Sequence, residues 1–239
     1  MEIAICVSGQ LVSNWKQCLD SWKESFRPHS VTWFGHTWTT KSAPNWYKNK
    51  SRQSTDVEIT KDEINELKSS YFNLQNLCID NPLGIENNNN LVLWDKNFHS
   101  QFYGVYKANY LKNYWELKKN KIFNLVIRLR WDLFLKNKFV LPIPKEHTLQ
   151  VIHSAYEGQV YRIGDMYWQG PSTVYNVVSN FYKNIKNYHS SMKIDEDFGV
   201  HHLFAYYCKE NSLNLETIYP DVKLYRDKPE YNSGGSHEL

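Results

Sequence analysis

Apolar runs and amphipathic stretches alternate along the first forty residues. Residues 3–7 form a continuous apolar run that stops at Ser8-Gly9, which is typical of a buried parallel strand followed by a tight loop. A second apolar run, 31–34, stops at residues 35–38. The pattern predicts one strand–helix–strand unit with its loops at the carboxyl ends of the strands. The intervening helix, which Asn14 is placed to cap, has one apolar face made of Trp15, Cys18, Leu19, Trp22 and Phe26.

The middle of the chain is more polar. Residues 39–59 are expected to form a loop. Thr60 is followed three residues later by Glu63, the pattern of a capping box, so a helix is expected from there to about residue 72. Residues 77–80 predict a short strand. A long helix is expected over 100–120, and we interpret its aromatic stripe as core rather than as a ligand platform; the stripe is Tyr103, Tyr106, Tyr110, Tyr114 and Leu117.

The second half of the chain continues the alternation of strands and helices. This alternation predicts an α/β, three-layer, Rossmann-like fold with a mostly parallel central sheet. We expect a single domain over 1–226 and a polar tail over 227–239. In such sheets ligands bind beyond the carboxyl ends of the strands. The expected strands are 125–134, 148–153, 161–167 and 213–218, and the expected helices begin after Gly170-Pro171 and at residue 195.

Composition and charge narrow the possible partners. The 28 Lys and Arg against 25 Asp and Glu leave a net charge of +3, too small for a protein that binds nucleic acid through a large basic field. The four cysteines include no C-x-x-C pair, which disfavours a zinc ribbon. No signal peptide is evident, and no run approaches the roughly 20 apolar residues of a membrane span. We expect a soluble cytoplasmic protein with no nucleic-acid partner and no membrane span. The glycine patterns of dinucleotide-binding folds and P-loops are missing from the sequence.

Three charges interrupt the expected central strand 125–134. Side chains two residues apart share a face of a strand, so Arg128, Arg130 and Asp132 are expected to point the same way. Charges on a central strand are costly unless they are paired or bind a ligand. One interpretation is an Arg–Asp ion pair on a half-exposed strand. The other is a metal and phosphate site, in which Asp132 offers hard oxygen to Mg²⁺ or Mn²⁺ and an arginine faces a diphosphate. The residues alone leave both open.

Acidic residues form a second candidate group. Asp195, Glu196 and Asp197 begin the last long helix, where carboxylates favour the helix dipole; one of the three is also free to act as a general base. Asp165 lies in an apolar-aromatic segment, where it either pairs with Arg162 or lines an acceptor site. His36 stands at a strand end, where an imidazole binds a base or a sugar, or has a structural role.

In their order along the chain, these pieces resemble a family of bacterial and viral glycosyltransferases with the GT-A fold. The resemblance covers roughly residues 2–210. It rests on a first strand ending in Ser8-Gly9-Gln10, a second ending in His36-Thr37-Trp38, the helix 100–119 and the R-x-R-x-D-L segment that begins at Arg128. That segment occupies the place of the metal-binding D-x-D motif of the fold. The later segment 164–170 and the acidic start of the last helix are similar as well.

The resemblance implies transfer of a sugar from a nucleotide-sugar donor to a hydroxyl of a glycan acceptor. Asp132 would bind Mn²⁺ or Mg²⁺, but Arg130 stands where the first Asp of D-x-D would be, so metal-assisted and arginine-assisted chemistry both stay open. Glu196 or Asp197 would be the base, with Asp165 also in the catalytic set. The alternatives are a non-catalytic carbohydrate-binding protein and a nucleotide- or nucleic-acid-binding α/β module. The implied donor-binding residues are Ser8, Gly9, Gln10, His36, Thr37, Trp38, Asp80, Arg128 and Arg130.

Overall fold

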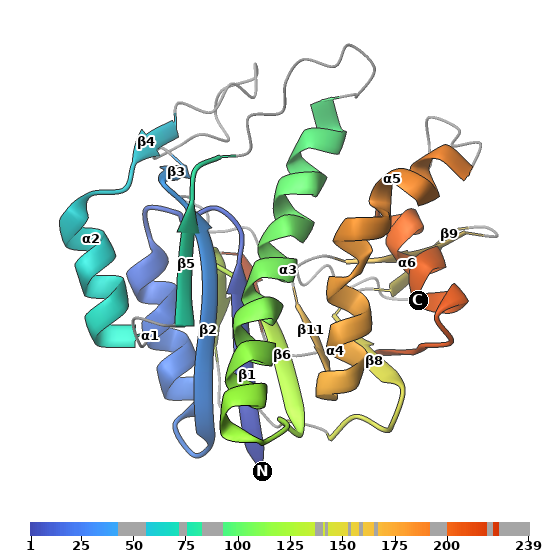
Figure 1. The fold of residues 1–239 in the computed structure, drawn as a ribbon, viewed down its shortest axis with the longest axis horizontal. Helices are drawn as coiled ribbons and strands as arrows, with labels where there is room; N and C mark the ends of the chain where they lie inside the picture. The colour runs from blue at the N-terminus through green and yellow to red at the C-terminus, as the bar shows by residue number, and fades with distance from the viewer. Residues whose placement is uncertain are drawn as a thin grey trace.

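A twisted seven-stranded sheet forms the centre of the protein. The computed structural model describes residues 1–42, 56–71, 76–82, 93–136, 141, 143–152, 154–157, 160–164, 167–191, 200–218 and 222–224. Within this part of the chain the strand order of the large sheet is β12-β8-β11-β6-β1-β2-β5 (Figure 1). The strands are β1 (Glu2–Ser8), β2 (Ser30–Trp38), β5 (Leu77–Asp80), β6 (Leu125–Arg130), β8 (Thr148–Val151), β11 (Trp168–Gly170) and β12 (Asn214–Thr217).

Parallel pairing dominates this sheet, as the sequence predicts. β1 pairs in parallel with β2 and β6, β2 pairs in parallel with β5, and β12 pairs in parallel with β8. Among the described strands of this sheet, only β11 is antiparallel to its neighbours, which are β6 and β8. The carboxyl ends of β1, β2, β5 and β6 therefore meet at one edge of the sheet.

Helices cover both faces of the sheet, which gives the three expected layers. α1 (Trp15–Phe26) and α2 (Lys61–Glu66), which continues into a π-helical turn (Leu67–Tyr71), lie on one face. The other face carries α3 (Leu93–Lys119), α4 (Ser172–Ser179), α5 (Phe181–Ser191) and α6 (Val200–Glu210) (Figure 1). Alternation along β6 divides its side chains between the two cores: Leu125, Ile127 and Leu129 pack on the α1 side, whereas Val126 packs on the α3 side.

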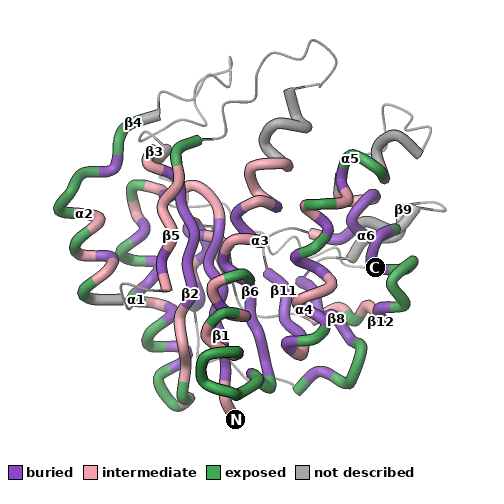
Figure 2. The backbone as a smooth tube through the Cα atoms, in the orientation of Figure 1, coloured by how far each residue is buried: buried purple, intermediate pink, exposed green. Residues whose placement is uncertain are grey.

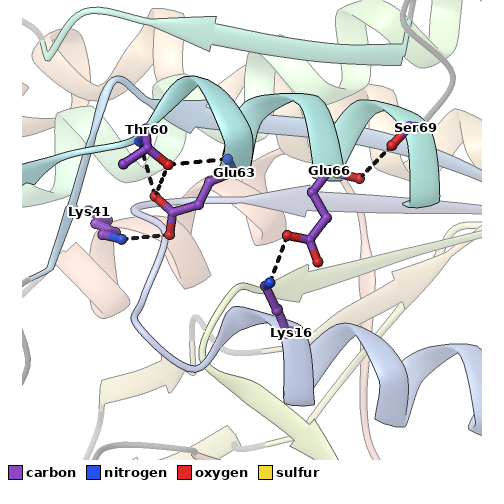
Figure 3. A network of polar contacts seen from close by, with 6 residues as sticks. All are labelled: Lys16, Lys41, Thr60, Glu63, Glu66 and Ser69. Atoms are coloured by element: carbon purple, nitrogen blue, oxygen red, sulfur yellow. Dashed lines mark hydrogen bonds and ion pairs between the residues drawn. The ribbon is translucent and has the colours of Figure 1, made fainter.

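The predicted capping box at the start of α2 is confirmed. The Thr60 hydroxyl accepts a hydrogen bond from the Glu63 backbone N–H at 3.2 Å, and the Glu63 carboxylate accepts one from the Thr60 backbone N–H at 3.0 Å (Figure 3). Lys41 also contacts Glu63 at 2.6 Å, and Lys16 of α1 contacts Glu66 at 2.7 Å. Burial alone would raise the pKa of Glu63, but the hydrogen bonds from Lys41 and Thr60 lower it. These contacts fasten α2 to α1 and to the chain that follows β2.

Three local expectations in the first half of the chain are wrong. Part of the expected loop 39–59 is strand, because β3 (Thr40–Ser42) pairs antiparallel with β4 (Asp56–Glu58). The Asn14 side chain makes no capping hydrogen bond, and the Asn14 backbone carbonyl instead accepts from Cys18. β2 also runs through Trp38, so residues 35–38 belong to the strand.

The charged strand expected over 125–134 is two strands separated by a turn at residues 131–132. β6 ends at Arg130, and β7 (Leu133–Leu135) leaves the large sheet to pair antiparallel with β13 (Val222–Leu224). The turn lets Asp132 fold back onto Arg130 rather than continue along the same strand. In the segment expected as one strand over 161–167, the described strand ends at Ile163: β10 (Val160–Ile163) pairs with β9 (Ser154–Glu157), and the next strand, β11, begins at Trp168 and belongs to the large sheet.

The aromatic stripe of α3 is not core along its whole length. Tyr110, Tyr114 and Leu117 are 58%, 55% and 82% exposed, and the green exposed turns of α3 are visible in Figure 2. The buried face of the helix is one position away and includes a lysine: Lys112 is buried, pairs with Glu116 at 2.8 Å and donates to the Ser172 hydroxyl. A lysine in a helix usually indicates a solvent-exposed position. The prediction therefore assigned the buried face to the aromatic stripe instead of to the face that contains Lys112. The described buried positions include Phe102, Val105, Ala108 and Lys112.

Other expected elements agree with the structure or lie outside the residues it describes. The helix expected after Gly170-Pro171 is present but is broken at Asn180 into α4 and α5. Cys6 and Cys208 are buried core residues. No helix in the described ranges is long and apolar enough to cross a membrane. The tail expected over 227–239 lies outside the described residues.

Candidate functional site

Polar side chains gather where four parallel strands end. β1 ends at Ser8, β2 at Trp38, β5 at Asp80 and β6 at Arg130, all at the same edge of the sheet (Figure 1). The register sets two pairs of residues side by side: Ser8 pairs with Arg130, and Trp38 pairs with Asp80. The crevice beyond the carboxyl ends of such strands is the usual ligand site in open α/β sheets. Six of the sequence-predicted donor-binding residues are thus placed at one edge or beside it: Ser8, Gly9, His36, Trp38, Asp80 and Arg130.

Gly104 of α3 lies directly over this edge. A Cβ atom at Gly104 would stand 2.9 Å from His36 Nδ1, 3.3 Å from Ser8 Cβ and 3.4 Å from the Gly9 backbone nitrogen. The first of these distances is too short for a real Cβ contact, so only glycine permits α3 to approach so closely. Gly9 itself has φ +119°, which a side chain would strain. Gly104 therefore lets the helix approach the loop after β1 and the end of β2, and Gly9 permits the backbone conformation of that loop.

Asp80 is the polar centre of the site. The Tyr103 hydroxyl donates to Asp80 Oδ2 at 2.9 Å, and the Cys78 thiol donates to Asp80 Oδ1 at 3.4 Å. Lys107 Nζ and His36 Nε2 each lie 3.5 Å from Asp80 Oδ2. Burial alone would raise the pKa of Asp80, but these hydrogen bonds and the positive charge of Lys107 lower it. Asp80 is therefore an ionised acceptor at neutral pH.

His36 is neutral and its ring is incompletely satisfied. Burial lowers the pKa of His36 to about 4, and the nearby Asp80 carboxylate offsets only part of that effect. Nδ1 of His36 and the hydroxyls of Ser8 and Thr37 are buried, and none has a hydrogen-bond partner among the described residues. Buried polar atoms of this kind are rare in folded proteins, and one established reason for them is a ligand or water that completes the hydrogen bonds.

Aromatic rings line the same place. The Trp38 indole stacks on Tyr103 with 5.5 Å between ring centroids and 17° between planes. The His36 ring meets both edge-on, at 4.7 Å from Trp38 and 5.4 Å from Tyr103. Edge-to-face and stacked arrangements are the favourable ones for aromatic pairs. The site therefore combines a rigid aromatic wall with an ionised carboxylate.

The two arginines of the R-x-R-x-D segment lie in different environments. Arg130 donates two hydrogen bonds to Asp132, 3.0 Å from Nε to Oδ1 and 2.8 Å from Nη2 to Oδ2. The Asp132 side chain is 7% exposed and that of Arg130 is 25% exposed. Arg128, two residues earlier on β6, is fully buried, and its guanidinium carbon lies 4.5 Å from the centroid of the Trp168 ring. The ion-pair interpretation of this segment is realised between Arg130 and Asp132, while Arg128 packs in the core.

The described residues do not make a metal site. Asp132 is the predicted ligand, but both of its oxygens accept from Arg130. No group of three His, Cys, Asp or Glu side chains in the described part of the chain is arranged to hold a metal ion. A divalent cation such as Mg²⁺ or Mn²⁺ requires several oxygen ligands. The donor set present therefore does not fit such an ion.

Two further predicted residues lie next to the site, and three fall outside the described part of the chain. Gln10 is half-buried in the loop after Gly9, and Thr37 is buried at the end of β2. The catalytic candidates Asp165, Glu196 and Asp197 lie outside the described residues. Sequence reasoning missed Gly104 and Lys107, and it assigned Tyr103 to the core. The only signal for Tyr103 and Lys107 was their four-residue spacing on one helix face, which does not reveal contact with β5.

Among known proteins, the chain shows a distant likeness to solved structures alone. No protein-family model matches the chain, and a search of curated proteins finds no match. Among solved structures, the chain is similar to a nucleoside-diphosphate-sugar pyrophosphorylase from Vibrio cholerae RC9. The identity is 10%, the TM-score is 0.42, and the alignment covers 93% of this chain and 95% of the other. A likeness this distant assigns neither family nor activity.

Proposed function

We propose that the protein is a glycosyltransferase that moves a sugar from a nucleotide-sugar donor to a hydroxyl group of a glycan acceptor. The observation that carries this proposal is the pair of buried, unsatisfied polar atoms at the carboxyl edge of the sheet, Ser8 Oγ and His36 Nδ1. His36 lies beside an ionised Asp80 and meets the Trp38–Tyr103 stack edge-on, and Ser8 ends the neighbouring strand β1. A nucleotide offers hydrogen-bonding groups and a flat ring, which matches this combination.

The donor nucleotide is held by the ends of the first three parallel strands. Ser8, Gly9 and Gln10 contact the nucleotide with side chains and backbone. The neutral imidazole of His36 offers one donor and one acceptor, and Asp80 accepts from hydroxyl or amide groups of the nucleoside. The tight approach of Gly104 holds these groups in place. Trp38 supplies the aromatic surface on which a flat base rests.

Arg130 stabilises the departing diphosphate. A guanidinium binds phosphate oxygens in a bidentate manner, and its charge does not depend on pH in the physiological range. Asp132 orients Arg130 through two hydrogen bonds, so the arginine is prepositioned at the strand end. Because the described residues do not complete a metal site, no step of this scheme uses a metal ion.

The acceptor is activated by a carboxylate. From the acidic start of the last helix we propose Glu196 or Asp197 as the general base, with Asp165 beside the acceptor. The base takes the proton of the acceptor hydroxyl, the hydroxyl oxygen bonds to the anomeric carbon, and the bond between that carbon and the phosphate oxygen breaks. The nucleotide leaves with the electron pair of that bond, and Arg130 neutralises the charge that develops on it.

A turnover experiment tests this proposal. The protein is incubated with UDP-, GDP-, dTDP- and CMP-sugars and a mixture of oligosaccharides, and mass spectrometry follows both the free nucleotide and the extended glycan. We expect one donor class to be consumed with equal release of nucleotide and transfer of sugar. Arg130→Gln, Glu196→Gln and Asp197→Asn are compared with the exposed control Tyr114→Phe. Loss of transfer in Arg130→Gln but not in the control supports the scheme. Oligosaccharide binding without any donor turnover contradicts it and supports a carbohydrate-binding protein.

A further inference from the structure

Three tyrosine rings from two helices meet beside the candidate site. Tyr103 and Tyr106 come from α3, and Tyr182 comes from α5. The Tyr182 ring lies 5.3 Å from that of Tyr103, edge to face, and 5.7 Å from that of Tyr106, stacked at 29°. All three residues are half-buried. We call Tyr103, Tyr106 and Tyr182 the tyrosine platform.

Two lysines flank the platform. Lys107 Nζ lies 5.5 Å from the centre of the Tyr103 ring, and Lys183 Nζ lies 4.8 Å from the centre of the Tyr106 ring. Lys107 also pairs with Asp80, whereas Lys183 is exposed. An ammonium held over a ring keeps a positive charge at an aromatic surface, and such contacts are weak enough at exposed sites for a ligand to replace them.

The platform has unused hydrogen-bonding capacity. The hydroxyls of Tyr106 and Tyr182 have no hydrogen-bond partner within the described ranges. Burial raises the pKa of Tyr182, the nearby Tyr106 raises it further, and Lys107 opposes the shift, so Tyr182 lies within electrostatic reach of both neighbours. A phenol with a free hydroxyl presents an apolar ring and a polar tip to the same ligand.

The tyrosine platform lies directly next to the proposed donor site. The Tyr103 hydroxyl donates to Asp80 at 2.9 Å, and the Tyr103 ring stacks with Trp38. α3 and α5 lie side by side on the same face of the sheet (Figure 1), so the rings extend from the ends of β2 and β5 toward α5. A ligand on the platform therefore lies next to a donor held at the strand ends.

We propose that the tyrosine platform binds the acceptor and that the acceptor is an acidic glycan. Sugar rings have apolar C–H faces that pack on aromatic rings, and their hydroxyl groups pair with phenols. The carboxylate of an acidic sugar pairs with Lys183 and with Lys107 at the two sides of the platform. The acceptor role rests on the proposed transferase function, but the binding of an acidic glycan is measurable without turnover.

Calorimetric titration with two oligosaccharides of equal length tests the proposal. The acidic probe is tetragalacturonate and the neutral probe is maltotetraose. We expect the wild-type protein to bind the acidic probe about tenfold more tightly, a preference that weakens with added salt because the ion pairs are partly exposed. Tyr106→Ala and Tyr182→Ala each weaken binding about tenfold, and Lys183→Gln removes most of the preference for the acidic probe.

Controls separate a binding role from a folding role. Tyr114→Ala removes an exposed ring from the same helix and leaves both affinities unchanged. Tyr106→Phe and Tyr182→Phe keep the rings, so they retain the fold and lose less affinity than the alanine variants. Equal affinity for the two probes, no binding of either probe, or an equal loss in Tyr114→Ala overturns the proposal.

A parallel titration with nucleotide sugars distinguishes this proposal from the proposed function. If a nucleotide sugar binds and is turned over while tetragalacturonate does not bind, the acidic-glycan platform is wrong and the transferase function stands. If tetragalacturonate binds through the platform while no nucleotide sugar binds, the platform stands as a glycan site and the transferase function is wrong.

Discussion

The indole Nε1 of Trp131 donates a 2.9 Å hydrogen bond to the backbone carbonyl of His36. This bond ties the turn after β6 to β2, across the intervening β1. It links the segment that carries Asp132 to the strand that carries His36, and so joins the arginine–aspartate pair to the aromatic wall. Trp131 is buried, and its ring also packs against Trp22 at 6.3 Å.

Trp131→Phe removes this tie while keeping an aromatic ring. We expect the free energy of unfolding to fall by about 2 kcal/mol, because a buried carbonyl loses its donor and the smaller ring leaves space. Urea denaturation measures the loss. Donor affinity is expected to fall as well, since the two halves of the site lose this link. An unchanged affinity in a folded variant would show that the tie is only structural.

Gly104→Ala tests the close approach of α3. The added methyl group meets His36 Nδ1, so either the helix or the imidazole moves. Alanine favours a helix by about 1 kcal/mol over glycine, but overpacking of this kind costs about 1–3 kcal/mol. We expect lower thermal stability together with weaker nucleotide binding. Lys118→Ala, on the same helix but away from the site, is the matched control and is expected to leave nucleotide binding unchanged.

The stability of the protein is expected to depend on pH through His36. Burial lowers the pKa of His36 from 6.5 to about 4, so between these values the unfolded chain binds a proton that the folded chain does not. The free energy of unfolding is therefore highest above pH 6.5, as far as His36 is concerned, and it falls as the pH is lowered toward 4. Each pH unit inside this window costs up to about 1.4 kcal/mol. Urea denaturation at several pH values, compared with His36→Gln, measures the difference in slope; equal slopes contradict the assignment.

Mn²⁺ or Mg²⁺ alone is expected to leave the thermal midpoint of the nucleotide-free protein unchanged. Arg130 occupies both oxygens of Asp132, and no metal-binding group of three residues is found in the described ranges. Differential scanning fluorimetry with and without EDTA measures the effect. A rise in midpoint with Mn²⁺ that disappears in Asp132→Asn would restore the metal interpretation of this residue.

Local sequence patterns predicted the layers of the fold, because a strand that is buried on both of its faces is a continuous apolar run in the sequence. The run 3–7 and the helical spacing from Trp15 to Phe26 both correspond to observed elements, and the Thr60–Glu63 capping box is confirmed. Those features depend on neighbours in sequence. The break after Arg130 does not, because it results from the pairing of β7 with β13, which is about ninety residues away in the chain.

The candidate site was predicted in part for the same reason. Ser8, His36 and Asp80 were found because each stands where a strand ends, which is visible in the sequence. Tyr103, Gly104 and Lys107 were missed because their role follows from how α3 crosses the sheet. The buried face of that helix includes Lys112, so it differs from the aromatic face that was predicted. Apolar periodicity does not predict a charged residue at the centre of a buried face.

The most direct test of the site is a thermal shift with nucleotides. UDP, GDP, dTDP and CMP are each added to wild type, Ser8→Ala and Asp80→Asn, with Thr60→Ala as a control that weakens the cap of α2 outside the site. A ligand that binds only the folded protein raises its midpoint by mass action. We predict that one nucleotide raises the midpoint of wild type and of Thr60→Ala, and that the rise is much smaller in the two site variants. No rise with any nucleotide, or an equal rise in all four proteins, would contradict a nucleotide site at Ser8, His36 and Asp80.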